Sequence, residues 1–127
     1  MKVAGLGCRR GTPAEEIEAV IAMALARLRA GITALDALAT LEEKAQESGL
    51  REAARRLQLP LIACPAEAMR AVADRIATPS GRAKAAFGVP SVAEAAALSA
   101  AGASSHLLLP RIATARATCA IAEGGAR

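Results

Sequence analysis

The sequence predicts an α/β fold: a three-layer α/β/α sandwich around a central, mixed sheet of about five strands. Short apolar runs alternate along the chain with segments whose apolar residues recur at helical spacing. The last two predicted strands have no helix between them, so at least one strand pair is expected to be antiparallel. A length of 127 residues bounds the chain to one domain, over residues 1–127.

The first strand and the first helix carry the clearest signals. Lys2–Leu6 is a short apolar run and is interpreted as a buried strand. Thr12 suits the N-cap of the following helix, with Pro13 at the first helical position and Glu15 completing a capping box. Gly31 is expected to close this helix. Its apolar stripe consists of Ile17, Val20, Ile21, Ala24, Leu25 and Leu28.

The middle of the chain repeats this alternation. Leu35–Leu41 predicts the second strand, although alanine and leucine also suit a helix. Residues 48–57 predict a short amphipathic helix that ends before Pro60. A third, short strand is expected over Leu61–Ala63, followed by a helix over residues 65–76.

The C-terminal part begins with a predicted loop over residues 78–81, whose Thr-Pro-Ser-Gly sequence is typical of turns. Ser91 and Glu94 then form a second capping box, which opens a helix that runs to Gly102.

Two strands complete the predicted sheet, over His106–Leu109 and Thr118–Ala122. The segment between them, residues 110–117, is interpreted as a loop or an irregular strand. The tail, residues 123–127, is expected to fray.

Composition and charge exclude several classes of function. The chain is 54% hydrophobic and 22% charged, which excludes a disordered tail or linker. Phe87 is the only aromatic residue, so no stacking platform for bases or sugars is present. The formal net charge of +4 favours anionic partners but is far below that of a duplex-binding module. No nucleic-acid partner is therefore expected.

The cysteines and the apolar runs limit the metal content and the compartment. Cys8, Cys64 and Cys119 lack metal-finger spacing and His106 is the only histidine, so no metal or cofactor is predicted. A sparse, odd number of cysteines favours a reducing compartment, and the N-terminus lacks an apolar signal region. The longest uncharged stretch, residues 95–110, is too short and polar to span a bilayer. The sequence predicts a cytoplasmic protein without a membrane partner.

The segment from Gly5 to Thr12, Gly-Leu-Gly-Cys-Arg-Arg-Gly-Thr, is the strongest candidate for a binding site. It leads into a helix N-terminus, whose unpaired N–H groups and partial positive charge favour anions. Glycines let a ligand approach the backbone, and Arg9 and Arg10 can each bind a carboxylate or phosphate through two hydrogen bonds. The alternative is a tight turn with two solvated arginines. The candidate residues are Gly7, Cys8, Arg9, Arg10, Gly11 and Thr12.

A nucleotide site is the weaker interpretation of this loop. Its glycines are spaced one residue longer than in the dinucleotide fingerprint, and the ribose-binding acid expected about 20 residues further on is missing. Cys8 lies beside two arginines, which favours a thiolate, but no histidine is placed to act as its base. A small packed residue is the preferred interpretation of Cys8.

Further polar side chains are expected at the same edge of the sheet. Lys44 follows the second predicted strand and Arg111 follows the strand that begins at His106. Ligands of open α/β sheets bind where strands end, so these residues and the two loop arginines would form a cationic rim for a polyanion. Separately, each would be an ordinary solvated charge. Ser80 and Ser91 bracket a loop that could add hydroxyls.

Four segments together carry a resemblance that covers nearly the whole chain: residues 5–16, 38–50, 88–98 and 117–122. Their most specific motifs are Gly-Leu-Gly-Cys-Arg-Arg-Gly and Gly-Val-Pro-Ser-Val-Ala-Glu-Ala-Ala-Ala. They resemble the CobE and CbiG C-terminal domain family of cobalamin biosynthesis proteins. The resemblance implies the handling of a corrin-ring intermediate. In CbiG-type proteins the associated reaction opens the ring-contracted precorrin lactone, with loss of acetaldehyde.

The resemblance also implies which residues form the site. The family's loop residues correspond to Cys8, Arg9, Arg10 and Gly11, its lysine after the second strand to Lys44, and its serine-bearing loop to Ser80 and Ser91. Two positions depart from the family pattern. Arg111 replaces a lysine, which keeps the charge but changes its geometry, and Cys64 replaces a serine at the end of the third strand.

The preferred hypothesis is a carrier or accessory protein that binds a polycarboxylate precorrin intermediate, with other cobalamin-pathway enzymes as candidate partners. Because the chain begins at Met1 and CbiG proteins have further domains before this one, the stand-alone form is expected. A second hypothesis is a hydrolase of the lactone, for which Cys8 and Glu15 are the local candidates for nucleophile or base. A third is a structural subunit whose basic rim contacts an acidic protein.

Overall fold

The computed structural model describes residues 1–76, 91–102 and 104–124. Within these residues a five-stranded sheet has the order β3-β2-β1-β5-β4. Its strands are β1 (Lys2–Cys8), β2 (Ala37–Leu41), β3 (Leu61–Cys64), β4 (His106–Ala113) and β5 (Ala117–Glu123). β1, β2 and β3 are parallel, whereas β5 is antiparallel to both β1 and β4. The sheet is therefore mixed, as predicted, and β4 runs in the same direction as β1.

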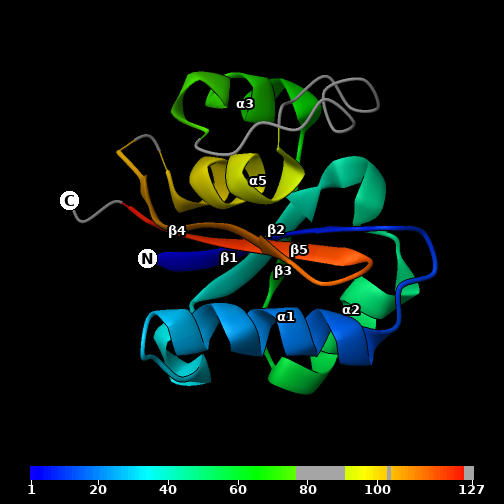
Figure 1. The fold of residues 1–127 in the computed structure, drawn as a ribbon. Helices are drawn as coiled ribbons and strands as arrows, with labels where there is room; N and C mark the ends of the chain where they lie inside the picture. Colours follow the sequence, from blue (N-terminus) through cyan, green and yellow to red (C-terminus); the bar gives the residue numbers. More distant parts are fainter. Residues whose placement is uncertain (77–90, 103, 125–127) are drawn as a thin grey trace.

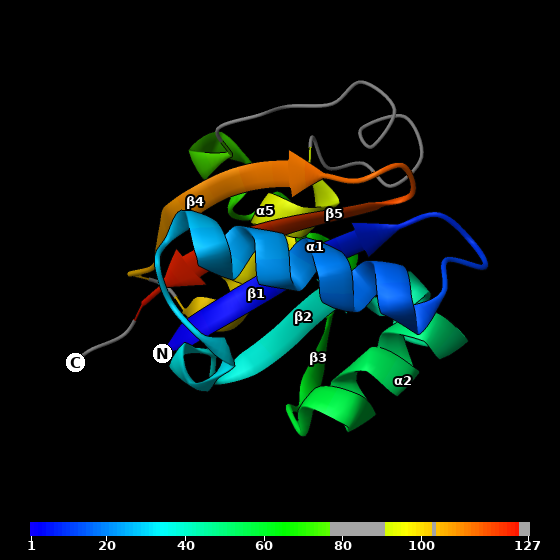
Figure 2. The same cartoon turned by 60° about the horizontal axis from the view of Figure 1, so that its bottom comes forward.

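Helices cover both faces of the sheet (Figure 1). α1 (Ala14–Arg27) and α2 (Ser48–Leu57) lie on one face, and α3 (Ala66–Arg70) and α5 (Val92–Ala101) lie on the other. Figure 2 shows α1 across the middle of the sheet and α2 beside β3. Three 3-10 turns complete the described elements: η1 (Ile32–Ala34), η2 (Glu42–Lys44) and η3 (Ala73–Arg75). The predicted three-layer α/β/α sandwich is confirmed.

Apolar residues on both faces of the sheet form two clusters, which explains why the strands read as continuous apolar runs. The cluster beneath α1 and α2 includes Leu6, Ile17, Ile21, Leu38, Leu50 and Ile121. The cluster beneath α5 and α3 includes Val3, Leu41, Met69, Val92, Leu98 and Ala122. Successive residues of β1 enter opposite clusters, with Val3 in one and Ala4 in the other, because successive strand side chains point to opposite faces.

Close packing of α5 on β1 accounts for the alanine-rich composition of α5. A Cβ atom built at Gly5 would lie 2.0 Å from the carbonyl oxygen of Ala93 and 2.6 Å from the backbone nitrogen of Ala97. α5 can approach the strand this closely because its contacting residues are small and Gly5 has no side chain. The packing of α5 on β1 therefore explains why residue 5 is a glycine. The sequence had suggested a different reason, the approach of a ligand to the backbone.

Two helix ends differ from the predictions. α1 ends at Arg27, and Arg29 adopts the left-handed conformation with a φ of 55° while the N–H of Ala30 donates to the carbonyl of Leu25. Gly31 has extended backbone and does not close the helix, so that prediction was wrong. The helix predicted over residues 65–76 is also divided: α3 ends at Arg70, and the separate turn η3 follows.

The last strands are longer than predicted. Pro110–Ala113, expected to be a loop or irregular strand, belong to β4, whose pairing with β5 shifts register around Leu109. A proline is tolerated because β4 is an edge strand. Glu123 pairs with Lys2, and Gly124 exchanges two backbone hydrogen bonds with Met1. The prediction that the chain frays from residue 123 was therefore wrong for these two residues. Residues 125–127 lie outside the described residues.

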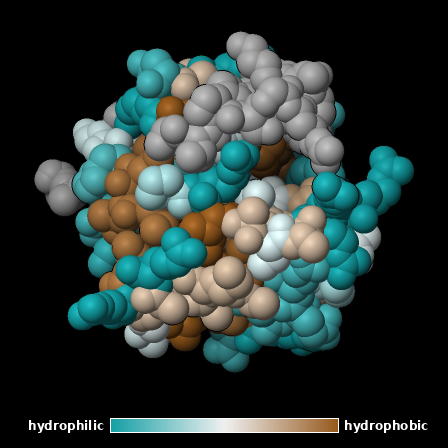
Figure 3. All heavy atoms as spheres, in the orientation of Figure 1, coloured by the Kyte–Doolittle hydropathy of each residue, from teal (hydrophilic) through white to brown (hydrophobic). Residues whose placement is uncertain are grey.

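The edge strand β4 leaves part of its apolar surface open. Leu107, Leu108, Leu109 and Ile112 are only half-buried, and Figure 3 shows apolar surface at the level of the sheet. Pro110 and the register shifts interrupt this edge, which discourages pairing with another strand. No helix within the described ranges is long and apolar enough to cross a membrane.

Candidate functional site

Among the described residues, Arg9, Arg10, Thr12 and Lys44 lie on segments that follow β1 and β2 at one edge of the sheet, which we call the carboxyl edge. β1, β2, β3 and β4 all end there, and β5 begins there. The segments that adjoin these strand ends at the carboxyl edge include residues 9–13, 42–47 and 114–116. α1 and α2 also begin at this edge, because each follows a strand that ends there.

The β1–α1 loop is held by hydrogen bonds to the turn between β4 and β5. The N–H of Arg9 donates to the carbonyl of Arg116 at 2.8 Å, and the N–H of Thr12 donates to the carbonyl of Arg9 at 3.2 Å. The Thr12 hydroxyl donates a hydrogen bond to the carbonyl of Arg9 at 2.7 Å, and Thr12 is only 2% exposed. The predicted cap is wrong, since Pro13 occupies the N-cap position and no side chain caps α1. Thr12 instead fixes the shape of the loop.

Gly7, near the end of β1, and Gly11, in the β1–α1 loop, are required as glycines for different reasons. A Cβ at Gly7 would lie 2.7 Å from the hydroxyl oxygen of Thr118 and 3.6 Å from Cβ of Val92, so Gly7 lets β5 and α5 pack closely. Gly11 has a φ of 80° and no heavy atom within 4 Å of a Cβ built there. It therefore provides the left-handed turn that the loop requires, at an open position.

Cys8, Lys44 and Glu47 lie close enough together for their charges to interact. Burial raises the pKa of the half-buried Cys8 thiol, while Lys44 opposes this rise and Glu47 adds to it. The Oε1 atom of Glu47 accepts a hydrogen bond from the N–H of Gly11 at 3.0 Å. At neutral pH the Cys8 thiol is protonated, which weakens its candidacy as a nucleophile. Lys44 is thus brought beside the β1–α1 loop.

The start of α5 contributes Ser91 and Glu94. The buried Ser91 hydroxyl accepts a hydrogen bond from the N–H of Glu94 at 3.3 Å, which confirms Ser91 as the N-cap. The Glu94 carboxylate, fully buried, accepts from the N–H of Arg111 at 2.8 Å and so joins α5 to β4. Arg111 lies within β4, two residues before its end, whereas the sequence placed it after that strand. Ser80 and the loop predicted over residues 78–81 lie outside the described residues.

Glu94 and Glu16 make prominent contacts here, although the sequence did not indicate either of them as a site residue. Glu94 could have been noticed as the one charged residue in the apolar run from Val92 to Leu98. Glu16 accepts hydrogen bonds from the Thr114 hydroxyl at 2.6 Å and from the N–H and side chain of Arg116 at 2.7 and 2.8 Å. Glu16 thereby ties α1 to the β4–β5 turn across 100 residues of sequence, for which spacing gives no signal.

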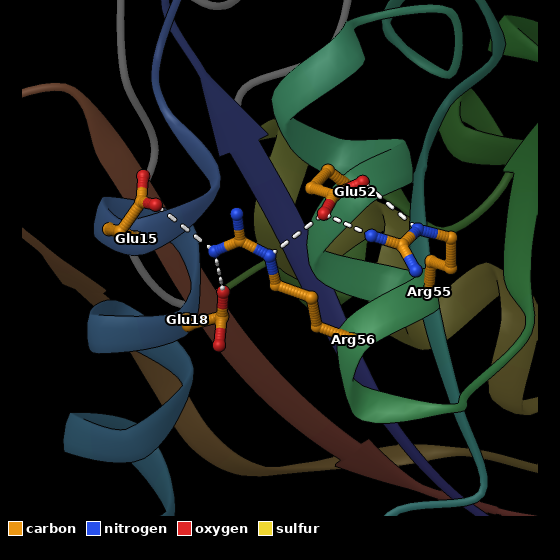
Figure 4. Close-up of polar contacts among 5 residues, drawn as sticks. All are labelled: Glu15, Glu18, Glu52, Arg55 and Arg56. Carbon is orange, nitrogen blue, oxygen red and sulfur yellow. Dashed lines mark hydrogen bonds and ion pairs between the residues drawn. The ribbon is translucent and has the colours of Figure 1, made fainter.

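Glu15 belongs to an ion-pair network between α1 and α2 (Figure 4). Arg56 donates to Glu15 at 3.1 Å, to Glu18 at 3.0 Å and to Glu52 at 2.9 Å, and Glu52 also pairs with Arg55. The pKa of the Glu15 carboxyl is lowered, first by its own backbone N–H and then by Arg56. A carboxyl held ionised in this way is a poor proton acceptor, and its predicted part in a capping box was wrong. A cavity of about 380 Å³ beside this network is lined by Gly11, Thr12, Pro13, Ala14, Glu15, Ser48, Gly49, Glu52 and Arg56.

Arg9 and Arg10 are exposed in the β1–α1 loop. Cys64 is the last residue of β3, and its buried Sγ lies 3.8 Å from the carbonyl oxygen of Ala96. Within the described ranges, no group of three or more His, Cys, Asp or Glu side chains could hold a metal ion. At the carboxyl edge the arrangement therefore offers the cationic side chains of Arg9, Arg10 and Lys44.

Comparisons with known proteins agree with this architecture. Residues 2–122 match the family described as Cobalamin synthesis G C-terminus. Protein CobE from Sinorhizobium sp is 39% identical over 120 residues, which cover 94% of this chain and 78% of that protein. The crystal structure of CobE, a protein from the cobalamin (vitamin B12) biosynthetic pathway, superimposes with a TM-score of 0.93 at 35% identity and covers 98% of this chain and 91% of that one.

A further relative is similar over a shorter region. Cobalt-precorrin-5A hydrolase from Priestia megaterium is 50% identical over 50 residues, or 39% of this chain and 13% of that protein. The chain therefore corresponds to a small part of that hydrolase. With a family match over almost its whole length, this chain belongs to the Cobalamin synthesis G C-terminus family of cobalamin biosynthesis proteins.

Proposed function

We propose that the chain binds a precorrin-type tetrapyrrole with many carboxylates at the carboxyl edge, and acts as a carrier or accessory protein for a pathway enzyme. The observation that carries the proposal is the parallel direction of β1, β2 and β4. It gathers Arg9 and Arg10, Lys44 and Arg111 toward the same edge from three separate segments. Their common property is positive charge, and a tetrapyrrole intermediate with many carboxylates would carry the opposite charge.

The width of this edge suits a ligand that is larger than a single anion. Neighbouring strands lie about 4.8 Å apart, so three spacings separate β2 from β4 by about 14 Å. Lys44 follows β2 and Arg111 lies near the end of β4, with the loop arginines between them after β1. A macrocycle with carboxylates on its rim can reach several of these groups at once.

The chemistry predicts a preference for several carboxylates over one. An exposed ion pair stabilises by only about 0–1 kcal/mol, so one carboxylate would bind weakly. Guanidinium groups can hold carboxylates through two hydrogen bonds, and an ammonium group adds a compact charge. Because these charges are near the surface, binding should weaken as salt concentration rises. Arg116 is not counted in the site, since Glu16 already neutralises it.

Opening of the precorrin lactone is the second candidate function. It is favoured by the similarity of 50 residues to cobalt-precorrin-5A hydrolase. Hydrolysis requires a positioned base or nucleophile. Of the two local candidates, the Cys8 thiol has a raised pKa and the Glu15 carboxyl has a lowered pKa and pairs with Arg56. Neither is suited to the chemistry near neutral pH, so we favour binding.

Partners and compartment follow from the same proposal. A carrier must receive its ligand from one enzyme and deliver it to another, so other cobalamin-pathway enzymes are the proposed protein partners. The cytoplasm is the proposed compartment, in keeping with the free thiols of Cys8, Cys64 and Cys119.

Incubation of the purified chain with precorrin and cobalt-precorrin intermediates separates the two functions. Binding predicts a shift in visible absorbance with no change in the mass of the tetrapyrrole. Hydrolysis predicts the release of acetaldehyde and the corresponding loss of mass. An unchanged spectrum across the set of intermediates, at protein concentrations of about 100 μM, would contradict tetrapyrrole binding. Any remaining affinity would then have a Kd above about 100 μM, which corresponds to a binding free energy weaker than about 5.5 kcal/mol.

A further inference from the structure

Glu47 places a carboxylate on the backbone of the candidate loop. Its Oε1 atom accepts the Gly11 N–H at 3.0 Å, from a residue 36 positions away in the sequence. Gly11 is exposed, and its left-handed turn leaves open space around it. The same N–H would be available to a carboxylate of a bound ligand if Glu47 were elsewhere. The protein's own side chain thus occupies a donor that a polyanion could use.

The position of Glu47 in α2 does not require this contact. Glu47 occupies the N-cap position of α2, but its side chain makes no capping hydrogen bond there. Its backbone is fixed on both sides, because its N–H donates to the carbonyl of Lys44 and its carbonyl accepts the N–H of Arg51. The side chain can therefore move while the start of the helix stays in place.

A comparison with Glu16 shows how lightly the Glu47 carboxylate is held. Glu16 receives three hydrogen bonds from Thr114 and Arg116, and its side chain is only 16% exposed. The hydrogen bond described for the Glu47 carboxylate comes from Gly11 alone, in an exposed setting. Replacing that carboxylate by one from a ligand exchanges one charge-assisted hydrogen bond for another of the same kind.

We propose that Glu47 is an internal placeholder, whose carboxylate occupies the Gly11 N–H in the unliganded protein and is displaced by a carboxylate of the bound tetrapyrrole. This inference rests on the function proposed above. Glu47 and Lys44 both lie close enough to Cys8 to interact with it electrostatically. The negative charge of Glu47 is therefore near the end of β1, beside the β1–α1 loop. Displacement requires competition, which disfavours ligands with one carboxylate and favours those with several, held simultaneously by other cations. Glu47 would thus determine specificity.

The test uses uroporphyrin, a tetrapyrrole with eight carboxylates, as the probe for the full chain and its variants. Glu47→Ala removes the placeholder, and Glu47→Gln leaves a neutral acceptor whose hydrogen bond is weaker. Glu43→Gln is the matched control, because Glu43 is an exposed carboxylate in the adjacent turn η2 and its substitution removes the same charge. Thermal unfolding of each variant checks that it is folded.

We expect uroporphyrin affinity to rise by about fivefold in Glu47→Ala, less in Glu47→Gln, and by under twofold in Glu43→Gln. In the wild-type protein, the amide resonance of Gly11 should shift on titration together with the side-chain carboxyl resonance of Glu47. If the wild type binds uroporphyrin but the Glu47 variants bind it no more tightly than Glu43→Gln does, Glu47 is not a placeholder, and the proposed binding function stands. If neither the wild type nor any variant binds, the proposed function fails, and the inference fails with it.

Discussion

A methyl group at Gly5 should displace α5 from the sheet. The added Cβ would lie 2.0 Å from the carbonyl oxygen of Ala93, about 1.4 Å closer than the 3.4 Å at which ordinary contact begins. The neighbouring backbone nitrogen of Ala97 would be only 2.6 Å away. Because both atoms belong to the backbone, no side-chain rotation can relieve the overlap, and the helix must move as a unit.

The expected cost of Gly5→Ala is about 3 kcal/mol, at the upper end of the range for overpacked cores. For a chain of this length the entropy of unfolding is about 0.27 kcal/mol/K, so Tm should fall by about 11 °C. The start of α5 would move with the helix, and Ser91 and Glu94 would no longer hold the same position beside β4. Tetrapyrrole binding should therefore weaken even at temperatures at which the variant is folded.

Gly11→Ala is the matched control for this substitution. It adds the same methyl group where no atom lies within 4 Å, and its cost comes only from the φ of 80°, roughly 1 kcal/mol. Circular dichroism melts and urea titrations of both variants give the comparison. If Gly5→Ala melts within 2 °C of Gly11→Ala, Gly5 is not explained by packing against α5.

Two further predictions concern titratable groups. The Thr114 hydroxyl, and then the Arg116 N–H, lower the pKa of the Glu16 carboxyl below its ordinary value of 4.5. The contribution of Glu16 to the free energy of unfolding is therefore fully present above pH 4.5 and is lost as the pH falls through the pKa of the folded state. The wild-type Tm should therefore fall more steeply below about pH 4.5 than that of Glu16→Gln, and equal slopes would contradict a stabilising contact. Burial raises the pKa of the Cys119 thiol to about 12. Iodoacetamide at about pH 8 should therefore modify the half-buried Cys8 first, and Cys119 only after unfolding in urea. Mass spectrometry that shows rapid labelling of Cys119 in the native protein would be inconsistent with its burial.

The elements of the fold were largely predictable because local signals and tertiary packing agree. The short apolar runs at Lys2, Leu35 and Leu61 all became strands, and the run of helical spacing after Pro13 became α1. The lack of a helix between the last two strands correctly indicated a mixed sheet. Where tertiary contacts compete with local chemistry, the predictions were less accurate. Thr12 has the right type and position for an N-cap, but its hydroxyl bonds the Arg9 carbonyl instead.

The polar residues of the candidate site were only partly predictable. The rule that parallel strands end at one edge correctly brought Lys44 close to Cys8, at the end of β1. The contacts of Glu16 with Arg116, of Glu94 with Arg111 and of Glu47 with Gly11 join residues between 17 and 100 positions apart. No short-range spacing encodes such pairs, because they depend on the order and register of the strands. The glycines were also ambiguous, since an approaching ligand and an approaching helix impose the same requirement for a missing side chain.

The most direct test of the cationic edge is a titration of Arg9→Ala/Arg10→Ala with uroporphyrin or a precorrin intermediate. Arg27→Ala/Arg29→Ala is the matched control, because it removes the same charge from the opposite end of α1. We expect the loop variant to bind at least tenfold more weakly and with a smaller dependence on salt, whereas the control should bind within about twofold of the wild type. Equal affinities of the two double variants would contradict the assignment of the ligand to the carboxyl edge.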